Sequence, residues 1–277
     1  MNLGTFKKLT MRPLTLFTYI FISFSLFSQP RSKEDSLKAE SFFKRAMSSQ
    51  LFSRDRQLLL DSALQILPSQ PYYWQQKSMP LSKQKKYELA ISYIDSAVKY
   101  DPTLHWREYR AFMKCIFQKS YRDAIYDFEF VKEKNEDGNV MDHTFNFYIG
   151  LCYLQLNQFE KATSYFQKSI QFRMNKWNMA HYLEYFYLGI TYMELQQYDK
   201  AIINLDNAIL GYRQFSDAKF YKANILNKLG RTAESKLLIE ECLLDLKKGY
   251  TINEDNVIYE EYPYQIKKYW LTGLYKD

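Results

Sequence analysis

The sequence contains few of the residues that form tight turns or cross-link loops. Its 277 residues include only 8 Gly, 7 Pro and 3 Cys. Scarce Gly and Pro argue against a protein built from many tight turns, because these residues supply much of the backbone geometry that turns need. Cys115, Cys152 and Cys242 are odd in number and widely separated, which excludes a disulfide framework. We expect three buried free thiols, with one disulfide as the alternative.

Long apolar runs are also missing. The longest, over residues 14–27, has about 14 residues, whereas a membrane-spanning helix needs about 20. Basic residues precede this run and Ser28 follows it, an order typical of a secretory signal peptide. We therefore predict a signal peptide over residues 1–28 with cleavage near Ser28, and an exported protein that is periplasmic or secreted. No membrane span is expected after leader removal, and an uncleaved anchor is the alternative.

A strong excess of one charge is absent as well. The formal net charge is +7, and it falls to +4 without the three basic residues of the predicted leader, since 35 basic residues then face 31 acidic ones. Both signs are interspersed, so we expect no nucleic-acid partner. The chain is nevertheless 47% apolar and 18% aromatic, which is ample for a sizeable core.

What the sequence does have is internal repetition. Residues 147–170 align with residues 186–209 at 9 identities in 24 positions. Self-similarity with a period in the thirties indicates stacked units, each of which buries its apolar face against the next. Apolar residues recur three and four positions apart and no long alternating segment is present, so the units are predicted to be helical.

The repeated residues resemble the tetratricopeptide repeat family. That pattern places a large residue, Leu-Gly and Tyr on a first helix, and Ala, an aromatic residue and Pro on and after a second. The matching positions here are Trp74, Ala90, Pro102, Gly150, Tyr153, Ala162, Gly189, Tyr192 and Ala201. Six units follow, near residues 37–70, 71–104, 105–138, 143–176, 182–215 and 216–248. The resemblance implies an all-α fold, a right-handed α-solenoid of about six antiparallel helix pairs over residues 37–248.

The two ends of the repeat domain differ in composition. Residues 29–36 are polar and are predicted to be a flexible lead-in, with a fraying first helix as the alternative. Residues 249–277 leave the repeat register and are rich in Tyr, so we predict a C-terminal aromatic cap over the open face of the last repeat. A segment that docks a partner is the alternative.

The resemblance also implies a concave groove, lined by the first helices, that takes a peptide or a helix of a partner. Residues off the signature on those helices are the predicted groove residues: Trp106, Tyr109, Met113, Phe117, Phe147, Leu151, Leu154, Phe186, Ile190 and Met193. The alternative is that much of this stripe packs against neighbouring helices or the tail. The Lys, Asn and Arg clamp of one family subgroup is absent, because Phe220 stands where Lys is needed near Asn224. An acidic C-terminal tail is therefore not the expected ligand.

No motif for catalysis or cofactor binding is visible, so we predict a protein that is not an enzyme, with no catalytic residues and no cofactor. His105, His143 and His181 lie 38 positions apart, each near the start of a first helix. Adjacent helices are about 10 Å apart, while zinc ligands lie about 2 Å from the ion. Three such histidines cannot share one ion without help, so no metal site is predicted.

Together these features predict a non-catalytic scaffold or adaptor in a bacterial cell envelope, with a protein or peptide partner. The alternative is a carbohydrate- or peptidoglycan-associated accessory protein, in which groove aromatics stack on sugars. The sequence gives neither the partner nor the oligomeric state.

Overall fold

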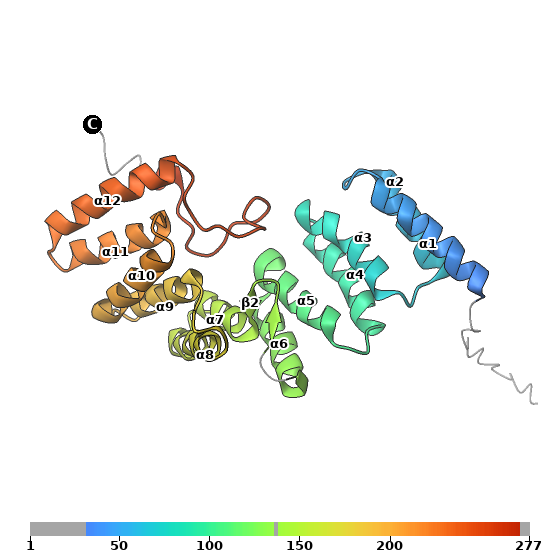
Figure 1. Ribbon diagram of the computed structural model, residues 1–277, viewed down its shortest axis with the longest axis horizontal. Coiled ribbons are helices and arrows are strands. Elements are labelled where there is room, and N and C mark those ends of the chain that lie inside the picture. Colours follow the sequence, from blue (N-terminus) through green and yellow to red (C-terminus); the bar gives the residue numbers. More distant parts are fainter. Residues whose placement is uncertain (1–31, 136–137, 272–277) are drawn as a thin grey trace, which may run out of the picture.

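The computed structural model describes residues 32–135 and 138–271 (Figure 1). The predicted signal peptide, residues 1–28, lies outside the described residues. The first six helices are α1 (Lys33–Ser48), α2 (Arg54–Ile66), α3 (Pro71–Lys83), α4 (Tyr87–Lys99), α5 (His105–Met113) and α6 (Tyr121–Asn135). The next six are α7 (Phe145–Gln155), α8 (Phe159–Trp177), α9 (Tyr182–Glu194), α10 (Tyr198–Gly211), α11 (Ser216–Lys228) and α12 (Thr232–Lys247). A short helix, α13 (Lys268–Leu271), ends the described chain.

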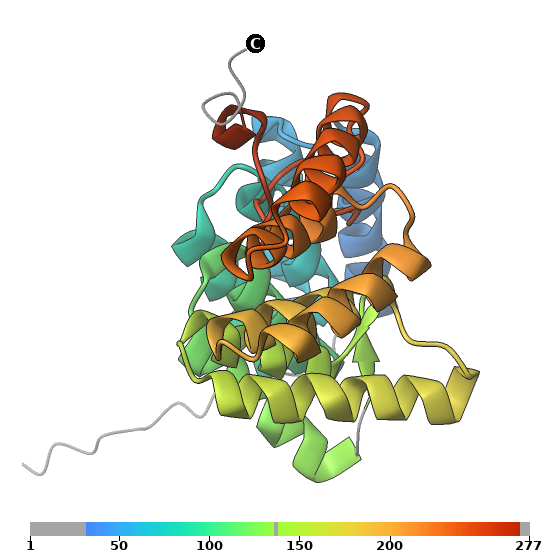
Figure 2. The same cartoon turned by 90° about the vertical axis from the view of Figure 1, so that its left-hand side faces the viewer.

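These helices form six consecutive antiparallel pairs, from α1/α2 to α11/α12, which confirms the predicted all-α solenoid. Neighbouring pairs in the sequence are neighbours in space, so the chain forms an arched row (Figures 1 and 2). Each pair leaves an apolar face that the next pair covers, as stacked repeats require. Among the described residues, no helix is both long and apolar enough to cross a membrane.

Small residues allow the two helices of a pair to approach closely. A Cβ atom built on Gly150 would lie 3.0 Å from the Phe166 ring, and one on Gly189 would lie 2.9 Å from Leu205 Cγ. Two further signature residues, Ala162 and Ala201, are fully buried on the facing helices. The repeat signature therefore marks close helix contacts, where extra side-chain volume would overpack the core.

The remaining signature residues have other roles. Trp74 on α3 donates its indole N–H to the carbonyl of Pro68 at 2.7 Å, which ties the pair to the turn before it. Ala90 is fully buried on α4, and Pro102 is exposed in the turn after α4. Tyr192 is buried and Tyr153 half-buried beside the small residues.

The first helix begins earlier than the predicted lead-in allows. Residues 29–36 were expected to be flexible, but α1 starts at Lys33. Ser32 caps it, because its side chain accepts the backbone N–H of Asp35 at 3.0 Å, and acidic residues occupy the first turn. Both features stabilise a helix N-terminus, so a polar stretch forms a regular helix here.

Two irregular features interrupt the third and fourth pairs. A π-helical turn, η1 (Lys114–Gln118), extends α5 and leaves Lys119 with a left-handed backbone, φ 61°. Two short strands, β1 (Asn139–Val140) and β2 (His143–Thr144), pair antiparallel before α7, and Thr144 caps that helix. The hairpin places the His143 side chain inside the protein.

The three cysteines are free and buried. The sulfur atoms of Cys115 and Cys152 are 3.4 Å apart, across the contact between η1 and α7. The thiol of Cys242 lies 3.3 Å from the carbonyl oxygen of Ser216. They lie at helix contacts, where a small apolar side chain packs well.

Residues 249–271, here called the C-terminal segment, do more than cap the last pair. Gly249 has φ +88° and stops α12, after which the segment is irregular until α13. It runs back from the end of α12 across the hollow side of the arch (Figure 1). Its contacts extend as far as Lys83, Tyr87 and Lys119, so the predicted cap over the last repeat's face is only part of its course.

Candidate functional site

The C-terminal segment lies on the hollow side of the arch, mainly against the first helices α9 and α11 (Figure 1). Asp217 on α11 anchors both ends of that segment. One carboxylate oxygen accepts the Thr251 hydroxyl at 2.7 Å and the Ile252 N–H at 3.1 Å, and the other accepts the Ile266 N–H at 2.7 Å. Burial raises the pKa of Asp217 to about 6, and these hydrogen bonds only partly oppose that effect.

A second anchor lies within the loop between these two attachment points. Glu260 is buried, accepts the hydroxyl of Tyr87 on α4, and pairs with Lys119 Nζ at 2.9 Å. Burial alone raises the pKa of Glu260, but the hydrogen bonds from Tyr87 and Lys119 outweigh burial and lower it overall. Lys119 follows η1, so this contact joins the segment to the third pair.

Tyrosine hydroxyl groups hold the middle of the segment. Tyr187 on α9 donates to the carbonyl of Pro263 at 3.1 Å, and Tyr182 accepts the N–H of Asn253 at 3.1 Å. In the opposite direction, Tyr264 donates to Glu194 at 2.9 Å. Three apolar side chains of the segment, Ile252, Tyr262 and Ile266, are buried. The concave face thus holds an irregular polypeptide by both polar and apolar contacts.

Most of the predicted groove residues are not open to a partner. Seven of the ten are buried, and only Trp106, Tyr109 and Met193 are partly exposed. Phe147 packs on the rings of Phe166 and Tyr187 rather than on the concave face. The sequence also allowed the alternative that much of this stripe packs against neighbouring helices or the tail. Seven buried side chains agree with that alternative: Met113, Phe117, Phe147, Leu151, Leu154, Phe186 and Ile190.

The concave face keeps an accessible part near the N-terminal pairs. Aromatic rings there follow one another from α1 through α3 to α5, with centroids 5.6 to 6.3 Å apart. Tyr72 is 46% exposed and Trp106 partly exposed. We call this row the aromatic ladder; its members are Phe43, Tyr72, Trp106, Tyr109 and Phe112. The C-terminal segment meets α3 at its last residue, Lys83, far from Tyr72 near the start of the helix.

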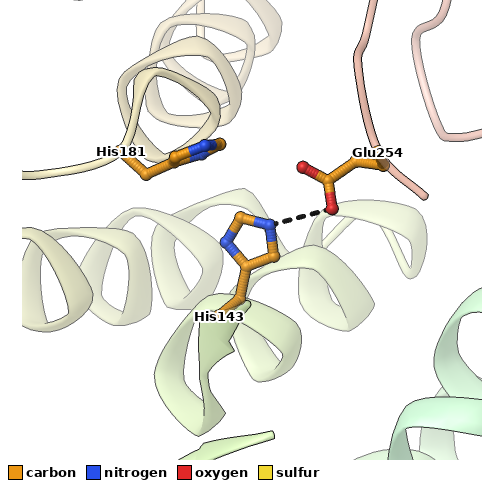
Figure 3. Close-up of side chains that lie close together, drawn as sticks. All are labelled: His143, His181 and Glu254. Carbon is orange, nitrogen blue, oxygen red and sulfur yellow. Dashed lines mark hydrogen bonds and ion pairs between the residues drawn. The ribbon is translucent and has the colours of Figure 1, made fainter. Parts of the chain in front are cut away.

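Two of the three histidines come together with an acid from the C-terminal segment (Figure 3). The ring centroids of His143 and His181 are only 5.0 Å apart, because side chains of neighbouring pairs lean toward each other. His143 Nε2 lies 3.2 Å from Glu254 Oε2. Burial, with the nearby His143 and Arg173, lowers the pKa of His181 to about 3. His105 stands apart, exposed at the start of α5. The three histidines thus do not come together as one group, but helix spacing does not keep His143 and His181 apart.

Several residues of this site were not predicted from the sequence. Asp217, Glu254 and Glu260 are single acids without a motif, and Tyr187 lies one position after the predicted groove residue Phe186. The only signal was the aromatic content of residues 249–277, which marks them as too apolar for a free tail.

Two of the helix pairs match a known repeat family. The tetratricopeptide repeat model matches residues 71–104 and 145–173, which are α3/α4 and most of α7/α8. No curated protein matches this sequence.

Among solved structures, PilW, described as a widely conserved type IV pilus biogenesis factor, is similar with a TM-score of 0.59 and 14% identity. The match covers 80% of this chain and 96% of PilW. PilF of Pseudomonas aeruginosa has a TM-score of 0.54 and 16% identity, over 79% and 94% of the two chains. The C-terminal part of a TPR repeat-containing protein from Cytophaga hutchinsonii has a TM-score of 0.55 and 14% identity, over 76% and 79%.

Identities this low show a shared fold and nothing about partners. The fold is shared over most of each chain, and the repeat model matches two of the six helix pairs. Residues 71–104 and 145–173 therefore match the tetratricopeptide repeat, and the chain as a whole has the fold of tetratricopeptide repeat proteins.

Proposed function

We propose that the protein is a non-catalytic scaffold of the bacterial cell envelope that binds a peptide segment of a partner protein on its concave face. The observation that carries the proposal is that this face already holds a polypeptide, its own C-terminal segment. Backbone groups of that segment are bound by Asp217 and Tyr187, as a peptide ligand would be. A face that binds main-chain groups can accept different side-chain sequences.

The aromatic ladder is the proposed contact surface. Its end at Phe112 is buried, where this ring packs 5.6 Å from the Tyr148 ring on α7, so the ladder offers a partner mainly Tyr72 and Trp106. Exposed aromatic side chains supply large contact areas at a low cost in conformational entropy, and they are frequent in binding hot spots. The expected ligand is a peptide with apolar or aromatic side chains, because the ladder offers rings rather than paired charges.

The envelope setting rests on the predicted signal peptide over residues 1–28. A structural relative, PilW, is described as a pilus biogenesis factor, which is consistent with a role in assembling an envelope complex. The alternative function, binding of cell-wall carbohydrate, is favoured by the same exposed rings, since aromatic faces stack on sugars.

The test is crosslinking in living cells. A photoreactive amino acid replaces Tyr72 in the full chain, and the captured protein is identified by mass spectrometry. The matched control carries the same group in place of Leu210, which is 68% exposed on α10 away from the ladder. We expect one dominant envelope protein from position 72 and none from position 210.

The captured partner then supplies a purified peptide for binding measurements. Trp106→Ala should weaken binding by more than about tenfold, as expected for a hot-spot residue. Trp177→Ala is the control, because Trp177 is an exposed tryptophan on α8. Equal capture at both positions would contradict the proposal, and binding of purified cell wall that is lost with Trp106→Ala would favour the carbohydrate alternative.

A further inference from the structure

Three potential metal ligands converge where the C-terminal segment passes the fourth and fifth helix pairs (Figure 3). His143 lies on β2, His181 is the N-cap residue of α9, and Glu254 belongs to the C-terminal segment. One ligand atom of each, a ring nitrogen or a carboxylate oxygen, lies within 4.8 Å of the other two. Within residues 32–135 and 138–271, no other group of three such side chains meets this condition.

The His143 ring is held in place before any ion binds. It is 1% exposed, stacks on Phe147 with centroids 4.0 Å apart, and meets Tyr148 edge to face at 5.8 Å. Its Nε2 faces Glu254, while its Nδ1 is buried without a hydrogen-bond partner. Nε2 is therefore the ring nitrogen that can share an ion with Glu254, and Nδ1 keeps the ring proton.

His181 is also positioned by its own helix. Its backbone N–H donates to Glu184 at 2.9 Å, which fixes the start of α9. Its Nδ1 accepts the Leu183 N–H at 3.4 Å, a long bond that is readily given up. Arg173 is the cation near His181. Its guanidinium group lies 3.6 Å from Glu184 and donates to the carbonyl of Asp142, so its partners are these acceptors and not the three potential metal ligands.

The ligand set indicates the metal. Two imidazoles and one carboxylate suit zinc and similar transition ions, with water in a fourth position. Ligands on a tetrahedral zinc ion with 2 Å bonds lie about 3.3 Å apart. The separation of 3.2 Å between His143 Nε2 and Glu254 Oε2 already meets this requirement. The widest separation needs to close by roughly 1.5 Å, which rotation of the side chains can supply.

We propose that His143, His181 and Glu254 form a zinc site that fastens the C-terminal segment to the concave face. Each histidine binds through one ring nitrogen and keeps its proton on the other, and the carboxylate binds ionised. Glu254 is the only ligand from the C-terminal segment, and both histidines belong to the helix pairs. The ion therefore joins the segment to the helix pairs that it lies against. The site stands whether or not the aromatic ladder binds a partner, since none of its residues lies on that ladder.

The test uses the full mature chain, purified without a polyhistidine tag and freed of metal. Zinc is titrated by calorimetry, and Co²⁺ is titrated in parallel for its visible absorption, which reports tetrahedral coordination. We expect one ion per chain. Hydrogen–deuterium exchange should slow in residues 250–267 when zinc is present and stay unchanged in α1 and α2.

Variants assign the ligands. Glu254→Gln should weaken zinc binding by more than about tenfold and abolish the slowing of exchange. Glu261→Gln is the matched control, since Glu261 is an exposed acid of the same segment, and His105→Ala controls for an exposed histidine. Binding that is unchanged by Glu254→Gln, the absence of binding at 100 µM zinc, or binding that leaves exchange of the segment unaltered would each overturn the proposal.

Discussion

The carboxylate of Asp217 on α11 accepts the backbone N–H of Ile266 at 2.7 Å, across 49 positions of sequence. Its other oxygen accepts the N–H of Ile252, so a single side chain closes the loop formed by residues 252–266. That loop carries the contacts to Tyr87 and Lys119, so Asp217 holds the base of the part of the segment that reaches the second and third helix pairs.

Asp217→Asn should therefore loosen the segment. The amide of Asn has one oxygen that can accept hydrogen bonds, whereas both oxygens of Asp217 accept them. The NH₂ group would replace the second oxygen, and it cannot accept a hydrogen bond from a backbone N–H. We expect hydrogen–deuterium exchange in residues 250–267 to become faster, while α1 to α4 exchange as before. Asp206→Asn is the control, because Asp206 is an exposed acid that pairs with Lys222 on the surface. Unchanged exchange in the Asp217 variant would show that the apolar contacts alone hold the segment.

The same residue predicts a pH dependence. Burial raises the pKa of Asp217 to about 6, above its ordinary value of 3.8, so the folded state binds more protons than the unfolded state between these values. The contribution of Asp217 to stability therefore rises as pH falls from above 6 to about 4. Denaturant unfolding of the wild type and Asp217→Asn at pH 7.5 and pH 4.5 measures it. The wild type should gain relative to the variant at pH 4.5, and a constant difference would contradict the prediction.

The repeat signature predicts a packing penalty. Gly150→Leu places a branched side chain where even a Cβ atom would lie 3.0 Å from the Phe166 ring. We expect a loss of about 1–3 kcal/mol in the free energy of unfolding. Ser164→Leu adds the same side chain at an exposed position of α8 and should change stability by less than about 0.5 kcal/mol. Similar values for both variants would mean that the helix contact can relax.

The fold could be predicted because its signal is local and repeated. Gly150 and Gly189 mark close helix contacts at equivalent places, and each contact is made within one helix pair. The course of the C-terminal segment could not be predicted from the sequence, because the residues that hold it are distant in sequence and do not recur at a fixed spacing. Tyr87 and Glu260, for example, are 173 positions apart.

The sequence also did not predict which of two adjacent side chains on α9 contacts the C-terminal segment. Phe186 was predicted to line the groove, but it packs on Phe215 and Tyr221, while the hydroxyl of its neighbour Tyr187 reaches the C-terminal segment. One residue turns a helix by about 100°, so a small error in helix rotation exchanges a groove residue for a core residue. The meeting of His143 with His181 depended on side-chain directions that the 38-residue spacing does not encode.

A buried ion cluster gives a further prediction. Asp127 on α6 is fully buried and accepts two hydrogen bonds from Arg110, at 2.6 and 2.8 Å, and one from Lys114 at 2.8 Å. Asp127→Ala leaves both cations without their buried partner and should lower stability by about 3–5 kcal/mol. Asp95→Ala removes an exposed partner of the same Arg110 and should cost about 0–1 kcal/mol. Thermal or denaturant unfolding separates the two, and equal losses would contradict the role of burial.

The cysteines provide a test that needs no substitution. All three are buried, and burial raises the pKa of Cys242 to about 12 and also raises the pKa of Cys152, so little thiolate is present at neutral pH. Because the thiolate is the reactive form, a thiol reagent should label no cysteine in the folded chain and three in denaturant. The sulfur atoms of Cys115 and Cys152 would have to close from 3.4 Å to about 2.0 Å to form a disulfide. Labelling of only one cysteine in the denatured, unreduced chain would show that this pair is oxidised, and it would replace the free-thiol prediction with the alternative.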